Sequence, residues 1–173
     1  MTLLDQVLAD ATSGFPEMYF QLPVSGQNPI YRERVYCYEL YHRLRSVWPK
    51  EWPYLLNGEI DKQGHSLLRR DQADRCKPDL LVHQPGCMSN NLAVIEVKAD
   101  NAKPAAIQKD INTLALFTQS QVGYKRGIYL IYGHNAEQMS QRVRSAIEER
   151  PDTGKIEVWL HPSPSQPAYR QSP

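Results

Sequence analysis

Two short apolar segments separated by a turn-rich linker constrain the fold of this chain more than any other feature. Residues 79–84 (DLLVHQ) and 92–98 (LAVIEVK) have the length and composition of strands. The linker between them, PGCMSNN, is rich in residues that favour turns. The pattern predicts an antiparallel hairpin. Because a hairpin returns to its starting point, Asp79, Glu96 and Lys98 are expected to come together.

The register of this hairpin decides which side chains meet. A loop centred near Met88 pairs residues whose numbers sum to about 176, which sets Asp79 opposite Val97. Glu96 and Lys98 then flank Asp79. The side-chain period of two places Glu96 and Lys98 on one face of the strand and their apolar neighbours on the other.

The remaining patterns predict helices and strands around this hairpin. Helical spacing of apolar residues predicts helices over 3–11 and 31–48, a third that begins at Pro104, and a fourth capped by Asn135. Short apolar or alternating segments predict strands over 54–61, 127–133 and 155–160. We therefore expect an α/β fold with a mixed β-sheet flanked by helices on both faces.

The chain's 173 residues suit one domain with short appendages. Residues 1–30, whose second half is rich in Gly and Pro, are expected to form an N-terminal arm with an extended loop. Residues 31–160 form the predicted domain. Residues 161–173 contain four prolines and no hydrophobic period, so they are expected to be a flexible tail.

Charge is unevenly distributed along the chain. The formal net charge is +1, but residues 1–30 carry three acidic residues and no Lys or Arg. Residues 31–77 hold ten Lys or Arg and seven Asp or Glu. Arg43, Arg69 and Arg70 are candidates for a phosphate-facing surface, although a solvated surface with ordinary ion pairs explains the same excess. The total excludes only a strongly basic, non-specific nucleic-acid binder.

Location follows from what the sequence lacks. We find no apolar run long enough to span a membrane and no basic start followed by a long apolar segment, as in a signal peptide. The three cysteines form no CxxC pattern. We expect a cytoplasmic protein with reduced thiols and no membrane partner.

The charged ends of the hairpin suit phosphodiester chemistry. The carboxylates of Asp79 and Glu96, with the carbonyl of Val97, are oxygen ligands that Mg²⁺ or Mn²⁺ accepts. A cation held there polarises a phosphoryl oxygen and lowers the pKa of a bound water. Lys98, on the same face as Glu96, is placed to stabilise developing negative charge. The competing interpretation is a salt bridge on an exposed strand.

The sequence from Pro78-Asp79 to Glu96-Val97-Lys98 resembles the motif of the PD-(D/E)xK nuclease superfamily. The predicted element order over residues 31–133 is also similar to that superfamily's core. The resemblance implies a restriction-endonuclease-like core, in the order α-β-β-β-α-β followed here by a C-terminal α-β pair. It implies that Asp79 and Glu96 bind the metal and that Lys98 is the catalytic lysine.

Further residues enter through the same resemblance. Glu39, on the first predicted core helix, matches a glutamate that many members direct at the metal. Gln108 matches a polar residue that touches the substrate backbone. Glu59, on the first predicted strand, either extends the metal shell, with a second ion, or is a charged strand end.

The resemblance implies a Mg²⁺-dependent nuclease, such as an endonuclease, with DNA as the expected partner. The alternative is an inactive nuclease-fold subunit that binds nucleic acid or a protein partner in a phage-defence or restriction complex. A third reading is an RNA or small-molecule hydrolase with the same metal site. A homodimer would let two sites address two strands.

Overall fold

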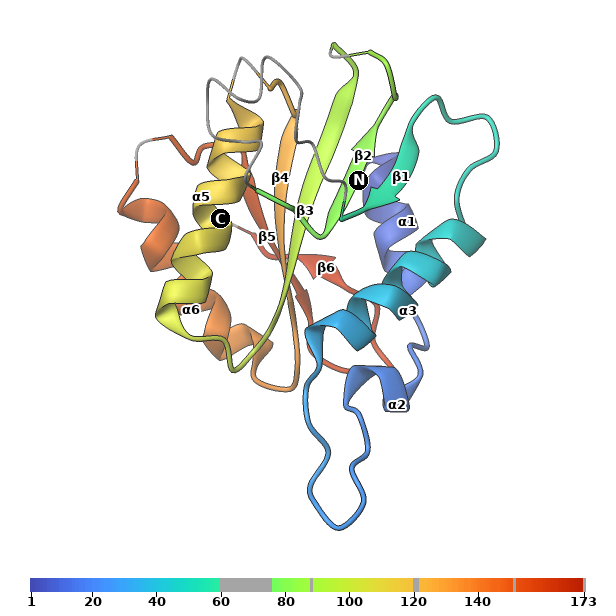
Figure 1. Cartoon of the computed structure of the whole chain (residues 1–173), viewed down its shortest axis with the longest axis vertical. Helices are drawn as coiled ribbons and strands as arrows, with labels where there is room; N and C mark the ends of the chain where they lie inside the picture. Colours follow the sequence, from blue (N-terminus) through green and yellow to red (C-terminus); the bar gives the residue numbers. More distant parts are fainter. Residues whose placement is uncertain (60–75, 88, 120–121, 151, 173) are drawn as a thin grey trace.

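The computed structural model describes residues 1–59, 76–87, 89–119, 122–150 and 152–172. Within them the fold is mixed α/β, with a central six-stranded sheet (Figure 1). The helices are α1 (Leu3–Thr12), α2 (Glu17–Phe20), α3 (Glu33–Ser46), α5 (Pro104–Thr118) and α6 (Ala136–Glu148). The strands are β1 (Leu55–Gly58), β2 (Leu80–His83), β3 (Asn91–Ala99), β4 (Arg126–Tyr132), β5 (Ile156–His161) and β6 (Tyr169–Arg170).

The strands lie side by side in chain order, from β1 to β6. The pairs β1–β2, β2–β3 and β5–β6 are antiparallel, whereas β3–β4 and β4–β5 are parallel. Parallel neighbours need a long crossover connection, and α5 and α6 provide the two crossovers. The expected mixed sheet is confirmed.

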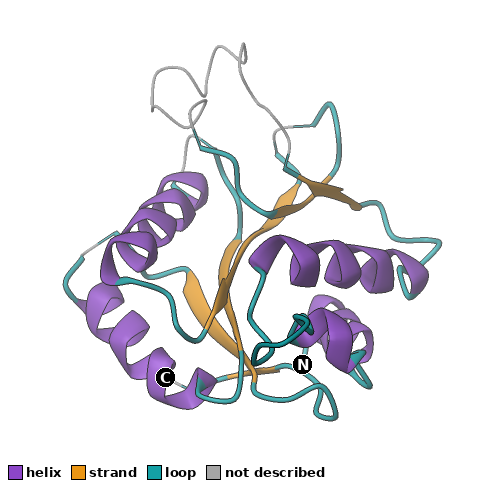
Figure 2. Ribbon diagram, turned by 60° about the horizontal axis from the view of Figure 1, so that its bottom comes forward, coloured by secondary structure: helices purple, strands orange, loops and turns teal. Residues whose placement is uncertain are grey.

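Helices cover both faces of the sheet, as Figure 2 shows edge-on. Helices α1, α2 and α3 lie on one face, and α5 and α6 on the other. Each layer has its own apolar core, because successive side chains of a strand point to opposite faces. On β3, Ile95 and Val97 pack toward α3, whereas Val94 packs toward α5.

The hairpin forms, but its register differs from the expected one. Leu80 pairs with Ile95 and Leu81 with Val94. Extended by one residue beyond the start of β2, this register would set Asp79 opposite Glu96 and not opposite Val97. In the loop, the Gln84 N–H donates to the Asn90 carbonyl and the Cys87 N–H donates to the Gln84 carbonyl. The strand pairing is also irregular between Val82 and His83. Directly opposite residues share a face, so the true register brings the two carboxylates together.

Residues 1–30 are part of the core and not a separate arm. Leu8 and Phe20 are fully buried, and Phe15 stacks on Tyr36 of α3 with ring centroids 4.7 Å apart. Part of the expected loop forms the short helix α2. The apolar residues of this segment supply the cover that the α3 face of the sheet needs.

The proline-rich C-terminal segment also differs from the expected flexible tail. Strand β6 pairs with β5 at the edge of the sheet. The Phe15 N–H donates to the Pro164 carbonyl at 2.8 Å, and the Ala168 N–H donates to Thr12 Oγ1 at 2.7 Å. These bonds tie the segment to α1 and to the loop after it.

Two further expectations concern membranes and thiols. Among the helices of the described residues, none has the length and apolar character needed to cross a bilayer. Cys37, Cys76 and Cys87 form no disulfide bond.

The turn after β4 depends on Gly133. This residue has φ +129°, and an added Cβ would lie 2.5 Å from Cγ of Asp100. The Asp100 carboxylate in turn accepts the Asn135 N–H at 2.7 Å, at the start of α6.

We predict that Gly133→Ala lowers the free energy of unfolding by about 2–3 kcal/mol, through backbone strain and this clash. Urea denaturation measures the change.

The matched control is Gly154→Ala, where an added Cβ meets no atom within 4 Å. It is expected to change the free energy of unfolding by less than about 0.5 kcal/mol. Equal effects of the two substitutions would contradict the assigned role of Gly133.

Candidate active site

The site lies where β2 ends and β3 continues. Strand β2 pairs with β3 only as far as Ile95, so the segment Glu96–Ala99 has no β2 partner along that edge. Here the Val97 N–H donates to Oδ2 of Asp79 at 2.7 Å. The Asp79 carboxylate thus takes the place of the backbone carbonyl that a neighbouring strand would offer. In an extended strand the N–H and C=O of one residue point to the same edge, so the Val97 carbonyl also faces this gap.

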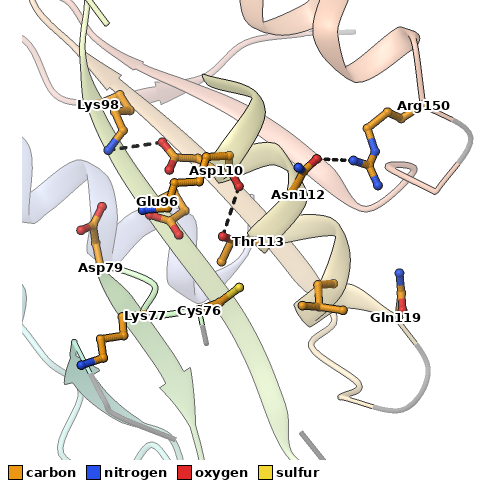
Figure 3. A pocket seen from close by; sticks show the side chains of 12 residues that line it. Cys76, Lys77, Asp79, Glu96, Lys98, Asp110, Asn112, Thr113, Gln119 and Arg150 are labelled. Carbon is orange, nitrogen blue, oxygen red and sulfur yellow. Dashed lines mark hydrogen bonds and ion pairs between the residues drawn. The ribbon is translucent and has the colours of Figure 1, made fainter. Parts of the chain in front are cut away.

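Asp79 and Glu96 meet at this gap. Both side chains line the same cavity, and each carboxyl group shifts the pKa of the other. Glu96 is 5% exposed and Asp79 is partly buried. Figure 3 shows the two side chains near each other beside β3, below Lys98 and Asp110. The two predicted metal ligands are therefore adjacent.

Lys98 connects the two helical layers. Its Nζ lies 2.9 Å from Oε2 of Glu33, at the start of α3, and 3.3 Å from Oδ2 of Asp110, on α5. Because no β2 residue lies beside this part of β3, the Lys98 side chain contacts α3 on one face of the sheet and α5 on the other. The ammonium is thus held between two carboxylates beside Asp79 and Glu96.

The surroundings of Asp79 and Glu96 disfavour the ionised form of both carboxyl groups. Burial raises the pKa of Glu96 well above its usual value, and the nearby charges of Asp79 and Asp110 raise it further. Burial also raises the pKa of Asp79, although the Val97 N–H and the Lys98 charge oppose this shift. Without a cation, the pair therefore retains a proton at pH values where a free carboxyl group would be ionised.

Lys98 stays protonated. Burial alone would lower its pKa, but the charges of Asp110 and Glu33 outweigh burial and raise the pKa above its usual value. Burial raises the pKa of Asp110 to about 6, even though Lys98 opposes that shift. Lys98 is consequently a fixed positive charge and a poor general base near neutral pH.

A cavity of about 670 Å³ opens over this group, toward α5. Asp79, Glu96 and Lys98 line its inner end. Further basic and polar side chains line the rest: Lys77, Lys109, Asn112, Gln119 and Arg150. Arg150 comes from the end of α6 and is hydrogen-bonded to Asn112 of α5 (Figure 3). The cavity thus combines an acidic pair with several cations, which suits a polyanionic ligand that carries or attracts a metal ion.

The donor set fits a hard divalent cation. Among the described residues, no group of three or more His, Cys, Asp or Glu side chains is arranged to hold a metal. The available donors are two carboxylates, Asp79 and Glu96, and the Val97 carbonyl. Mg²⁺ is commonly held by one or two carboxylates, with water and substrate phosphate completing its shell. A cation would also stabilise the ionised form of this acidic pair.

Two predicted site residues lie away from this cavity. The Glu39 carboxylate lies 4.0 Å from Arg43 and does not line the cavity with Asp79. Arg43 donates to the carbonyls of Ala11 and Ser13, both at 2.6 Å. Glu39 and Arg43 therefore lie outside the cavity over Glu96, and Arg43 contacts α1 and the loop after it.

The other predicted residues have different placements. Glu59 pairs with Arg34 at 3.7 Å and lines a separate cavity together with Asp79. Gln108 donates to Asn112 within α5 and does not line the cavity over Glu96. Arg69 and Arg70 lie outside the described residues.

Glu33 and Asp110 are the site residues that the sequence did not single out. Glu33 lies one turn before Cys37 and so extends the buried stripe of α3 by one step. Asp110 lies beside Ile111 and three residues after Ile107, at the margin of the buried stripe of α5. A charged residue at the margin of an apolar stripe is a usable signal, but it does not show which partner the charge meets.

Comparisons with known proteins add nothing to this geometry. Protein-family models, curated proteins and solved structures all give no match to this chain. The function of the site therefore has to be argued from the arrangement and chemistry of its side chains.

Glu96 makes the stability of the metal-free protein depend on pH. A carboxyl group whose pKa is raised by folding contributes stability below its unfolded pKa and loses it as pH rises through the folded pKa. Each pKa unit corresponds to about 1.4 kcal/mol. We predict that Glu96→Gln, in EDTA, has the wild-type melting temperature near pH 4 but exceeds it by at least about 3 °C at pH 8. A constant difference across this range would contradict the assignment.

Arg43 provides a test of structural against functional roles. Charge-assisted hydrogen bonds contribute about 1.5–3 kcal/mol each, so we predict that Arg43→Ala lowers the free energy of unfolding by about 2–3 kcal/mol. Urea denaturation measures this loss. Arg45→Ala, on an exposed position of the same helix, is the control and should change stability little. Wild-type stability of Arg43→Ala would show that its contacts with Ala11 and Ser13 are unimportant.

Proposed function

We propose that this protein is a Mg²⁺- or Mn²⁺-dependent nuclease that hydrolyses phosphodiester bonds in DNA. The observation that carries the proposal is the convergence of Asp79, Glu96 and Lys98 at the end of β3 that has no β2 partner, inside a cavity lined by further cations. Paired carboxylates and a fixed ammonium are the groups that metal-assisted phosphodiester hydrolysis requires.

Each residue has a distinct role in this proposal. Asp79 and Glu96 hold the cation, with the Val97 carbonyl as a further oxygen donor. When bound, the cation supplies positive charge that polarises a phosphoryl oxygen and makes water more acidic. Lys98 stabilises the negative charge that develops on the phosphoryl oxygens, because Glu33 and Asp110 keep it protonated and oriented.

The cations around the cavity suit the flanking phosphates of a strand. Lys77, Lys109 and Arg150 line the same cavity as the acidic pair. Such contacts fix the position of the backbone but carry no sequence information. We infer that they hold the scissile phosphate near Asp79 and Glu96.

The fold supports the same reading. The succession α3, β1, β2, β3, α5, β4 has the element order of the PD-(D/E)xK core, and the motif residues lie on the matching hairpin. In this proposal the core is restriction-endonuclease-like, with α6, β5 and β6 added at the far edge of the sheet.

The second candidate is a catalytically inactive module that binds nucleic acid or a protein partner. The observation that favours it is the absence, within the described residues, of a three-residue acidic or His/Cys group arranged around a metal position. Titration calorimetry with MnCl₂ separates the two. Binding that is lost in Asp79→Asn supports the nuclease, whereas no binding by the wild type supports the module.

Cleavage assays test the proposal directly. We predict that the wild type cleaves DNA with Mg²⁺ or Mn²⁺ and not in EDTA, and that Asp79→Asn and Lys98→Ala lower the rate by about 10²–10³-fold. Circular and linear substrates, single- and double-stranded, are analysed on denaturing gels.

The matched control is Glu39→Gln, which removes a carboxylate on α3 that lies outside the cavity. It should keep wild-type cleavage. Equal rates for all variants would reveal a contaminating nuclease, and a lack of cleavage by the wild type on every substrate would count against catalysis.

A further inference from the structure

A second cavity lies on the other side of Asp79. Its volume is about 330 Å³, and it opens between α3 and the β1–β2 edge of the sheet. Tyr38 and Tyr41 line it from α3, and Gly58 and Leu80 line it from the strands. Asp79 lines this cavity as well as the larger one over Glu96. Asp79 therefore lies between two cavities of different chemistry.

The charges of the two cavities differ. The larger cavity is lined by Lys77, Lys109 and Arg150 in addition to Lys98. Among the described residues, the smaller one is lined by no Lys or Arg, and its charged groups are the carboxylates of Asp79 and Glu59. A phosphate is attracted to the first cavity and repelled by the second. A neutral ring with a polar edge suits the second.

The walls of the smaller cavity suit a flat ring. Tyr38 is 64% exposed and lines this cavity, so its ring is accessible to a ligand there. The Tyr41 hydroxyl lies 3.5 Å from the Leu56 carbonyl, which anchors that ring beside β1. Gly58 keeps the floor open, since an added Cβ would lie 3.6 Å from the Asp79 carbonyl oxygen and 3.8 Å from Cδ2 of Tyr41.

We propose that the smaller cavity receives an unpaired nucleobase next to the phosphate held at Asp79, so that the preferred substrate is single-stranded nucleic acid. The inference rests on the proposed function and names its substrate class. A base within a duplex is stacked and paired, and it has to leave the helix to enter a pocket. An unpaired base enters without that cost and stacks on Tyr38, while the backbone follows the cations of the larger cavity.

Binding without cleavage tests this inference. Fluorescein-labelled single strands, as DNA and as RNA, and the matching duplexes are titrated in EDTA and followed by anisotropy. We expect Tyr38→Ala to weaken single-strand binding about tenfold and duplex binding less than twofold. Tyr38→Phe keeps the ring and should bind like the wild type. Tyr38→Leu keeps apolar area without a ring and should bind like Tyr38→Ala.

Two further variants separate stacking from general disruption. Tyr19 is an exposed tyrosine of α2 that lines neither cavity, so Tyr19→Ala should have no effect. Gly58→Leu adds a side chain at the cavity floor and should weaken single-strand binding as Tyr38→Ala does. A single strand that carries 2-aminopurine should lose fluorescence on the wild type and on Tyr38→Phe, but not on Tyr38→Leu.

The outcomes distinguish this inference from the proposed function. Wild-type single-strand binding that is undetectable, or unchanged in Tyr38→Ala, or no tighter than duplex binding, overturns the inference even if the protein cleaves DNA with Mg²⁺. Loss of ring-dependent binding in Tyr38→Ala supports the inference even if no cleavage is found, in which case only the catalytic proposal fails. Thermal melting of every variant confirms that each is folded.

Discussion

One hydrogen bond organises the site, from the Val97 N–H to Oδ2 of Asp79 at 2.7 Å. It forms at the segment of β3 after Ile95, which has no β2 partner. The Asp79 carboxylate there accepts a backbone N–H that a neighbouring strand would otherwise bind. Because the edge of β3 is otherwise open there, Lys98 reaches Glu33 on one face of the sheet and Asp110 on the other. The same opening makes Asp79 accessible from two cavities.

The electrostatics of this gap come at a cost to stability. Burial disfavours ionisation of both Asp79 and Glu96, and the charge of Asp79 disfavours that of Glu96 further, whereas Lys98 is held as an ammonium by two further carboxylates. Such an arrangement is unfavourable for a purely structural core, in which apolar side chains of similar volume would serve better. In the proposed function, a divalent cation would stabilise the ionised form of the acidic pair, and the ammonium of Lys98 would face an anionic ligand. We interpret this imbalance as the signature of a functional site.

The sequence was sufficient to predict the hairpin and the convergence of its charged ends, because apolar periodicity and turn residues are local signals. The exact register was not predictable, since it depends on how the turn closes and on the irregularity after Val82. The contact of Glu33 with Lys98 was not predicted, and Glu39 lies instead beside Arg43, which contacts the N-terminal segment. That packing is a long-range contact, and it leaves no local pattern in the sequence.

The central claim is that Asp79 and Glu96 together bind one divalent cation at the open edge of β3. Its most direct test is a crystal structure of the protein with Mn²⁺, in which anomalous scattering locates the ion. The account predicts an anomalous peak in contact with carboxylate oxygens of both residues, and its loss in Glu96→Gln. A fully occupied Mn²⁺ site elsewhere, with no ion in contact with Asp79 or Glu96, would contradict it.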